Sequence, residues 1–509
     1  MSAPETILGI DIGTGSAKAV LYSVTGAALT SQRVEYALIS TEPGMAELDA
    51  RQVHAAVCSA IRDAVHGNHQ TLLALSFSSA MHSLLAVDAH GAPLGHCITW
   101  ADNRATKWAE KIKRDFDGDA IYHRTGVPIH PMSPLVKLLW LCETQPELFG
   151  RAARFVSIKE YVLHELCGEW AADWSIASAS GLLNLRSLDW DAATLTVAGI
   201  TAQKLSPLVP TTHLLALSAA AASALGLAAG VPMVAGATDG VLSNLGVNAI
   251  DPGVVAINLG TSGAIRSVVA APETDRLGRT FCYALTDRHW VIGGSVNSGG
   301  IVLRWVRDQF ADTEVATAKR LGIDAYDVLT QLAAGAPPGS AGLLFHPYLA
   351  GERAPLWDAN ARGSFFGLAL HHRKEHLVRA VLEGVIFNLY SVFLALRDRM
   401  GEPTRIHATG GFARSALWRQ MMADIFQRPI SIPKEGESAC LGAAVLGLYA
   451  LGRIDSLHRV ASMVGMRHVH EPLEENAQAY EKLLPIYLRL ETKFRDEYRE
   501  IAEFQRRGS

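Results

Sequence analysis

The chain has 509 residues, which allows two large domains or three smaller ones at roughly 150 residues per domain. Its 46 Lys and Arg against 50 Asp and Glu give a net charge of −4, and no block of like charges occurs, which argues against a nucleic acid or an anionic membrane as a partner. The six cysteines form no C-x-x-C pair, which disfavours a disulfide framework and a cysteine-based zinc site.

Two segments bear on localisation. The N-terminal residues Met1 to Thr6 are polar and lack the basic and apolar regions of a signal peptide. The stretch from Lys204 to Asp239 contains no charge between these two residues, but proline and glycine divide it into a loop, a helix over 218–225 and a strand from Val231. We therefore expect a cytoplasmic protein without a membrane partner.

The first regular elements form a predicted hairpin. An apolar strand over 7–12 is followed by Gly13-Thr14-Gly15-Ser16 and by a second extended run over 17–24. A dinucleotide fingerprint would need a helix directly after the glycines, and a P-loop motif occurs nowhere in the sequence. The turn is either a plain structural hairpin or an anion site, because glycine lets backbone N–H groups approach phosphate oxygens closely.

The same pattern returns later in the chain. Residues 254–264 can be laid over residues 7–17 at a constant offset of 247, which places Gly260 and Thr261 on Gly13 and Thr14. Such an offset predicts two copies of one α/β domain, spanning 1–249 and 250–509. Two such turns could together hold a polyphosphate.

Two acidic residues follow apolar strands. Asp11 lies beside the first turn, where a carboxylate would repel phosphate unless a divalent cation intervenes, so it is a candidate magnesium partner through water. Asp239 follows the strand from Val231 and precedes a helical segment. It either faces a ligand or only caps that helix.

Three further motifs suit a ligand. Gly410-Gly411 separates a strand over 406–409 from a helix over 415–426 and would allow a flat group such as a purine to approach the backbone. Met81-His82-Ser83 and Trp100 to Arg104 place polar groups beside a thioether or aromatic surface, a mixture that suits polyhydroxylated ligands. A buried, hydrogen-bonded His82 is the alternative.

The C-terminal segment from Glu471 is charge-rich and predicts an amphipathic helix, with a possible kink at Pro485. The apolar side chains recur every three or four residues at Tyr480, Leu484, Tyr487, Leu490, Phe494, Tyr498, Ile501 and Phe504. This stripe either packs on its own domain or forms a homodimer contact.

Two longer motifs resemble the signatures of the FGGY carbohydrate kinases. The first is Met132-x-Pro134-x-x-Lys137-Leu138-x-Trp140-Leu141-x-Glu143, with Thr144 where a polar amide or acid is usual, and the second runs from Gly363 to Glu383. The resemblance spans nearly the whole chain. It implies an α/β fold of two ribonuclease-H-like domains, as in actin, facing a central nucleotide cleft, with ATP and Mg²⁺ as cofactors.

Carried over residue by residue, the resemblance implies a catalytic base at Asp239 and magnesium at Asp11 and Asp239. The residues implied to contact the nucleotide are Gly13, Thr14, Gly15, Ser16, Lys18, Gly260, Thr261, Gly300, Arg304, Gly410, Gly411 and Ser415. Those implied on the substrate side are Met81, His82, Trp100, Asp102 and Asp239. Lys18 stands where many relatives carry Arg, which keeps the charge but loses bidentate phosphate geometry.

Within the family, several segments resemble the bacterial gluconate kinases, among them Ser78 to Ser83, Ile98 to Arg104, Gly240 to Ala249 and Phe345 to Pro355. This implies phosphorylation of the terminal hydroxyl of D-gluconate, with Lys159, His130 and His82 as candidates to meet its carboxylate. A ketopentose kinase such as xylulokinase is the alternative substrate class. A chaperone-like ATPase that phosphorylates no small molecule is the alternative function.

Overall fold

The computed structural model describes residues 5–68, 71–434 and 436–507, so the first four residues of the predicted N-terminal segment lie outside it. The chain forms two compact units. The first comprises Met1–Pro252, Val268–Ile292 and Glu435–Gly465, and the second comprises Gly253–Ser267, Gly293–Lys434 and Met466–Ser509. Because each unit draws on separate stretches of chain, the contiguous domains 1–249 and 250–509 stay a prediction.

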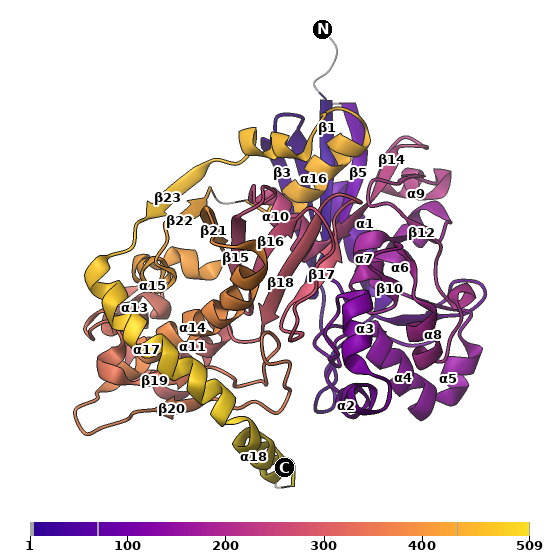
Figure 1. The fold of residues 1–509 in the computed structure, drawn as a ribbon. Coiled ribbons are helices and arrows are strands. Elements are labelled where there is room, and N and C mark those ends of the chain that lie inside the picture. The colour runs from indigo at the N-terminus through magenta and orange to yellow at the C-terminus, as the bar shows by residue number, and fades with distance from the viewer. Residues whose placement is uncertain (1–4, 69–70, 435, 508–509) are drawn as a thin grey trace. The chain divides into compact units, whose positions relative to one another are not determined.

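The first unit is built on a six-stranded sheet (Figure 1). The strand order is β13 (Leu214–Ala216), β14 (Pro232–Thr238), β5 (Thr71–Ser79), β1 (Glu5–Ile12), β2 (Ser16–Ser23) and β3 (Ala28–Glu35). β1, β2 and β3 pair antiparallel, whereas β5 is parallel to both β1 and β14. The predicted hairpin is confirmed, and the carboxyl ends of β1, β5 and β14 meet at one edge of the sheet.

Helices cover both faces of this sheet. Along β1, Leu8 and Ile10 pack in one apolar cluster with α1 (Ala50–Val65), and Ile7 packs in another with α16 (Ser438–Ala450), as the alternation of side chains along a strand requires. α16 lies directly on β1: the two backbones are so close that a Cβ at Gly9 would come within 2.1 Å of the Cys440 carbonyl oxygen. It also packs closely on α10 (Asp239–Gly246).

The rest of the first unit consists of short elements, some of which enclose a second apolar core. The helices are α2 (Thr106–Asp115), α3 (Gly118–Thr125), α4 (Pro134–Thr144), α5 (Pro146–Arg151), α6 (Ile158–Cys167), α7 (Trp174–Ser178), α8 (Ala192–Ala198) and α9 (Ala219–Leu225), with short 3₁₀ turns η1 (Ala202–Lys204) and η4 (Leu457–Ser462). The strands are β4 (Glu47–Leu48), β6 (Leu85–Val87), β7 (Cys97–Ile98), β8 (Arg154–Val156), β9 (Ala172–Asp173), β10 (Leu183–Asn184), β11 (Asp189–Trp190), β12 (Leu208–Val209) and β17 (Phe281–Ala284). The uncharged stretch before Asp239 contains α9 and β14, as predicted.

The second unit repeats the hairpin arrangement. β15 (Val254–Leu259) pairs antiparallel with β16 (Gly263–Val269) and parallel with β21 (Arg405–Thr409), which is followed by β22 (Ile430–Pro433) and β23 (Met466–His470). β18 (Trp290–Val296) and β17 complete a seven-stranded sheet, and the chain crosses between the units within β16 and β18. Ile12 pairs with Ala17, whereas Leu259 pairs with Gly263, so the second turn is one residue shorter than the first.

The helices of the second unit pack on one long apolar helix, α14 (Lys374–Met400). This helix is long and apolar enough to cross a membrane by length and composition, but 83% of its apolar window is buried inside the protein, as in a core helix. The other elements are α11 (Gly300–Phe310), α12 (Asp312–Leu321), α13 (Ala325–Ala334), α15 (Ala416–Phe426), β19 (Leu344–His346), β20 (Ser364–Phe366) and the 3₁₀ turns η2 (Ser340–Gly342) and η3 (Gly411–Arg414).

The predicted C-terminal helix is present as α17 (Glu474–Lys493) and α18 (Arg495–Arg507). The helix is continuous through Pro485, and the interruption falls instead at Phe494. α17 packs on α14 and α15 of its own unit. Ile501 and Phe504 on α18 stay exposed, and these are the side chains that a homodimer would cover.

Candidate functional site

The carboxyl edge of the first sheet gathers most of the residues predicted from the first half of the chain. Asp11 lies beside Ser78 and Ser78 beside Ala237 across the parallel strands. The turn after Ile12, the segment after Ser79 and Asp239 therefore leave the sheet at the same edge. Ligands of open α/β sheets bind outside the carboxyl ends of the strands.

Asp11 is buried at this edge, with 8% of its surface exposed. Burial raises the pKa of its carboxyl, although the hydroxyl of Ser78, which donates to Asp11 Oδ1 at 2.8 Å, acts in the opposite direction. A carboxylate in so poorly solvated a place gains from a nearby cation. The carboxylate oxygens of Asp11 and Asp239 are of the type that Mg²⁺ prefers, and their contact with magnesium stays a prediction.

Lys18 stands opposite Asp11 on β2. Its ammonium donates to Glu437 Oε2 at 2.5 Å, and the residue is partly buried. Glu437 directly precedes α16 and was not identified from the sequence. A phosphate contact of Lys18 would therefore compete with this ion pair.

Tyr36 stabilises the first turn through two hydrogen bonds. The Gly13 N–H donates to the Ser16 carbonyl at 3.0 Å, and Tyr36 donates through its hydroxyl to the Gly13 carbonyl at 2.5 Å and through its N–H to the Gly15 carbonyl at 3.1 Å. A Cβ at Gly15 would meet nothing within 4 Å, so this side of the turn is open. Thr14 Oγ1 accepts a 2.8 Å hydrogen bond from Trp100 Nε1, which links a predicted phosphate residue to a predicted substrate residue.

His82 is the buried, hydrogen-bonded histidine that the sequence left as an alternative. Its Nδ1 lies 2.7 Å from the Ala179 carbonyl oxygen and its Nε2 lies 3.2 Å from the Tyr283 hydroxyl. A carbonyl can only accept, so Nδ1 carries a proton and Nε2 can accept from the tyrosine. The ring is fixed in one orientation next to the half-buried Met81.

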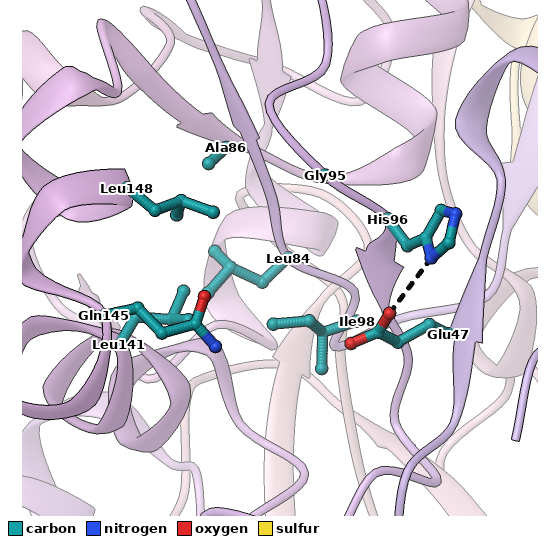
Figure 2. Close-up of a pocket in the computed structure, with 9 residues that line it drawn as sticks. All are labelled: Glu47, Leu84, Ala86, Gly95, His96, Ile98, Leu141, Gln145 and Leu148. Atoms are coloured by element: carbon teal, nitrogen blue, oxygen red, sulfur yellow. Dashed lines mark ion pairs between the residues drawn. The ribbon is translucent and has the colours of Figure 1, made fainter. Parts of the chain in front are cut away.

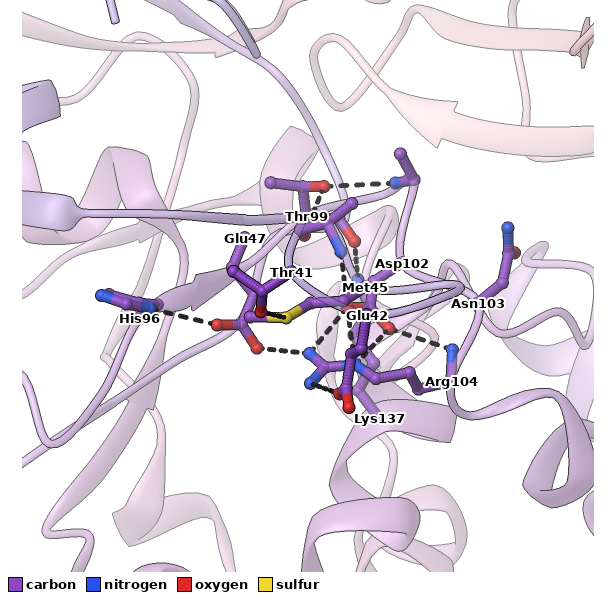
Figure 3. A network of polar contacts seen from close by, with 12 residues as sticks. Thr41, Glu42, Met45, Glu47, His96, Thr99, Asp102, Asn103, Arg104 and Lys137 are labelled. Atoms are coloured by element: carbon purple, nitrogen blue, oxygen red, sulfur yellow. Dashed lines mark hydrogen bonds and ion pairs between the residues drawn. The ribbon is translucent and has the colours of Figure 1, made fainter. Parts of the chain in front are cut away.

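Asp102 belongs to an ion network (Figure 3). Its carboxylate accepts from the guanidinium of Arg104 at 2.7 to 3.2 Å and from the Ala46 N–H at 3.0 Å, and only 1% of its surface is exposed. Arg104 also pairs with Glu42 and Glu47, and Glu47 pairs with His96 at 3.3 Å. These bonds give Asp102 a role in holding the loop that carries Trp100, while its predicted contact with substrate stays a prediction.

Asp239 is the first residue of α10 and is half-buried. The N-cap position belongs to Thr238, and the Asp239 carboxylate accepts from the Gly240 N–H at 2.7 Å. An acid in the first turn is stabilised as an anion by the helix dipole. Asp239 is therefore not the N-cap itself, and its predicted role toward a ligand stays a prediction.

Buried Lys159 supports the end of β14. Its ammonium donates to Asp173 Oδ2 at 2.8 Å and to the Ala237 carbonyl at 3.2 Å. Because Lys159 is fully buried and bonded to these two oxygens, the geometry argues against it as the partner of a substrate carboxylate.

In the second unit, the predicted nucleotide residues gather around the second turn. The Gly300 N–H donates to the Gly260 carbonyl at 2.7 Å and the Ile301 N–H to the Thr261 carbonyl at 3.1 Å, so the start of α11 rests on this turn. Gly410 has φ 107° and a Cβ there would lie 2.4 Å from the Leu259 carbonyl oxygen, which explains the need for glycine.

Gly411 begins the 3₁₀ turn η3, and the other two predicted residues lie at or on the adjoining helices. Ser415 is the N-cap of α15, where its hydroxyl accepts from the Trp418 N–H at 3.2 Å. Arg304 is exposed on α11, one turn after Gly300. The second unit thus places a helix start, a glycine turn and an exposed arginine near one another, features that suit an anion.

A cavity of about 190 Å³ lies in the first unit (Figure 2). Its wall includes Leu84, Ile98, Glu47 and His96, and none of the predicted site residues lines it. It is therefore not the predicted site.

Comparison with known proteins tests the resemblance. Residues 6–246 match the N-terminal domain of the FGGY family of carbohydrate kinases, and residues 255–451 match its C-terminal domain. A gluconokinase of Bacillus subtilis is 52% identical over 503 residues, which is 98% of each chain.

Solved structures agree with this. A gluconate kinase from Lactobacillus acidophilus superposes with a TM-score of 0.93 and a protein described as xylulose kinase from the same organism with 0.92. Each is 39% identical and covers 98% of this chain and all of its own. The resemblance and the predicted α/β fold of two domains are confirmed, and the chain belongs to the FGGY family of carbohydrate kinases.

Proposed function

We propose that this kinase transfers the γ-phosphoryl group of ATP to the terminal hydroxyl of D-gluconate and forms 6-phospho-D-gluconate. The observation that carries the choice of substrate is the 52% identity to a gluconokinase over 98% of both chains. The relatives described as xylulose kinases stand at 39% and below. A kinase that needs ATP and a soluble sugar acid fits the cytoplasm.

Asp239 is the proposed general base. Phosphoryl transfer asks a protein mainly to position the reactants and to neutralise charge. The half-buried carboxylate at the start of α10 accepts the proton of the attacking hydroxyl, and a base of ordinary strength suffices because the oxygen becomes more acidic as it bonds to phosphorus.

The proposed ATP contacts come from both turns and from the elements next to them. In the first unit they are Gly13, Thr14, Gly15, Ser16 and Lys18, and in the second Gly260, Thr261, Gly300, Arg304, Gly410, Gly411 and Ser415. Asp11 and Asp239 would hold Mg²⁺, which neutralises charge on the phosphates when it is bound. Chelation of divalent ions should therefore abolish turnover, and added Mg²⁺ should restore it.

On the substrate side we assign Met81, His82, Trp100 and Asp102. The fixed imidazole of His82 and the indole of Trp100 present a partly apolar surface with polar groups, which suits a polyol chain. Of the three candidates for the gluconate carboxylate, Lys159 is the least suited because Asp173 already neutralises it. Both ring nitrogens of His82 are also hydrogen-bonded, to the Ala179 carbonyl and the Tyr283 hydroxyl, which leaves His130 as the candidate.

The test is ADP release measured by a coupled assay with gluconate, xylulose, ribulose and glycerol in parallel. We expect the highest kcat/KM with gluconate. A higher value with xylulose would replace the substrate with a ketopentose, the alternative favoured by the TM-score of 0.92 to a protein described as xylulose kinase. ADP release that is equally fast with and without every acceptor would indicate an ATPase and contradict the proposal.

A further inference from the structure

The proposed mechanism assigns no role to Lys137, a buried lysine. Lys137 lies in the first turn of α4, whose N-cap is Ser133, and none of its surface is exposed. A cation near a helix N-terminus opposes the helix dipole, and burial of an ammonium is costly. Burial lowers the pKa of Lys137 to about 7. A lysine in such a place needs a compensating role.

Two backbone carbonyls compensate for the burial of the Lys137 ammonium. Lys137 Nζ donates to the His82 carbonyl at 2.6 Å and to the Thr99 carbonyl at 2.7 Å. Within the described parts of the chain, no carboxylate forms an ion pair with it. The charged and titratable groups around it are the Asp102 carboxylate, the Cys97 thiol, the Arg104 guanidinium and the His82 ring.

The two carbonyls belong to the two segments that carry the assigned substrate residues. His82 lies in the first and Thr99 directly precedes Trp100 in the second. Further along, Leu84 and Ile98 join these segments by reciprocal backbone hydrogen bonds of 2.9 Å. Closer to His82 and Trp100 than this backbone pair, the ammonium of Lys137 is hydrogen-bonded to both segments. Figure 3 shows Lys137 with Thr99 and Asp102.

We propose that Lys137 is a positioning residue that fixes the Met81–Ser83 segment relative to the Thr99–Asp102 segment and thereby sets the affinity for the sugar acid. The inference rests on the proposed function, since it takes these segments as the substrate side. Two charge-assisted hydrogen bonds hold the backbone at both points, and a 1 Å displacement of either segment would misplace His82 or Trp100. Lys137 itself touches no substrate.

The experiment measures gluconate binding by calorimetry, without nucleotide, for the wild type, Lys137→Met and Lys204→Met. Lys204 is the matched control, because it also donates to a backbone carbonyl, that of Ala152, in the same unit. We expect Lys137→Met to raise the Kd for gluconate about tenfold or more, the effect of losing one or two charge-assisted bonds. The KM for ATP at saturating gluconate should stay within about twofold, and Lys204→Met should bind as the wild type does.

Equal gluconate affinity of Lys137→Met and the wild type would overturn the inference, as would a parallel rise in the KM for ATP. A wild type that neither binds nor phosphorylates gluconate would instead contradict the proposed function.

Lys137→Arg covers the case in which Lys137→Met does not fold. Arginine stays charged at every assay pH. The affinity of the wild type for gluconate should weaken between pH 6 and pH 9, as the lysine loses its proton and its bonds lose their charge assistance, whereas that of Lys137→Arg should not change. Identical pH profiles of the two proteins would also overturn the inference.

Discussion

At the residue scale, the two acids of the first unit differ in their surroundings. Asp11 is buried on β1, and burial raises the pKa of its carboxyl, although the hydrogen bond from Ser78 acts against this. Asp239 is half-buried in the first turn of α10, where the helix dipole favours the anion. This difference suits a shielded metal partner in Asp11 and the proposed general base in Asp239.

Asp239→Asn should lower kcat by roughly 10²- to 10⁴-fold, the range for loss of a general base. The fold should persist, because asparagine keeps the shape and can still accept a hydrogen bond from the Gly240 N–H. Asp119→Asn, which changes an exposed acid in the first turn of α3, is the control and should leave kcat unchanged. Steady-state kinetics and circular dichroism check both variants, and near-normal turnover of Asp239→Asn would rule out the assigned base.

Thr14→Val should weaken binding of ATP and gluconate together. The hydroxyl of Thr14 accepts from Trp100 Nε1 at 2.8 Å, so its loss frees a substrate residue as well as a phosphate residue. A single hydrogen bond of this kind corresponds to about a threefold to tenfold rise in each KM. Thr196→Val on α8, where an exposed threonine bonds to its own helix, should change neither value. A rise in the KM for ATP alone would show that the bond to Trp100 has no functional role.

The pKa of Lys137 also predicts how stability depends on pH. Its value of about 7 in the folded protein lies below the ordinary 10.5, so between these values the unfolded chain binds more protons. Stability contributed by this site therefore rises with pH from about 7 to about 10.5. The free energy of unfolding in urea should increase with pH more steeply for the wild type than for Lys137→Met. If the free energy of unfolding of the two proteins depended on pH in the same way, Lys137 would titrate normally in the folded state.

At the element scale, the close packing of α16 on its neighbours depends on glycine. A Cβ at Gly442 would lie 2.0 Å from the Leu242 carbonyl oxygen on α10, and the backbone on both sides is fixed. Gly442→Ala should therefore destabilise the protein by about 1–3 kcal/mol or more. Gly150→Ala on α5 is the control, because a Cβ there meets nothing within 4 Å, and it should be neutral or stabilising by up to about 1 kcal/mol. Thermal unfolding checks both, and equal midpoints would contradict this packing.

The elements around the site were predictable because their signals are local. Apolar runs ending in glycine or aspartate marked β1, β14 and β15, and the helix signals after Ser218 and Ser415 located α9 and α15. The partners of the site residues were not predictable. Glu437 reaches Lys18 and Tyr283 reaches His82 across about 420 and 200 positions of sequence, and no local pattern encodes such contacts.

At the scale of the whole molecule, the internal repeat correctly indicated two related halves. Both sheets contain an antiparallel hairpin whose first strand lies beside a parallel strand, as the offset of 247 requires. The repeat gave no sign that the chain returns to the first unit at Val268–Ile292 and at Glu435–Gly465. Those returns depend on long-range packing such as that of α16 on β1, which composition and periodicity do not record.

The central claim is phosphoryl transfer to one hydroxyl of one sugar acid, with Asp239 taking its proton. The most direct measurement is ³¹P NMR of the product formed from ATP and gluconate by the wild type and by Asp239→Asn at equal enzyme concentration. We predict one phosphomonoester coupled to the two protons of the terminal carbon, accumulating at least a hundredfold more slowly in the variant, at the lower limit for loss of a general base. Inorganic phosphate as the only product, or a phosphoester formed equally fast by both proteins, would contradict the account.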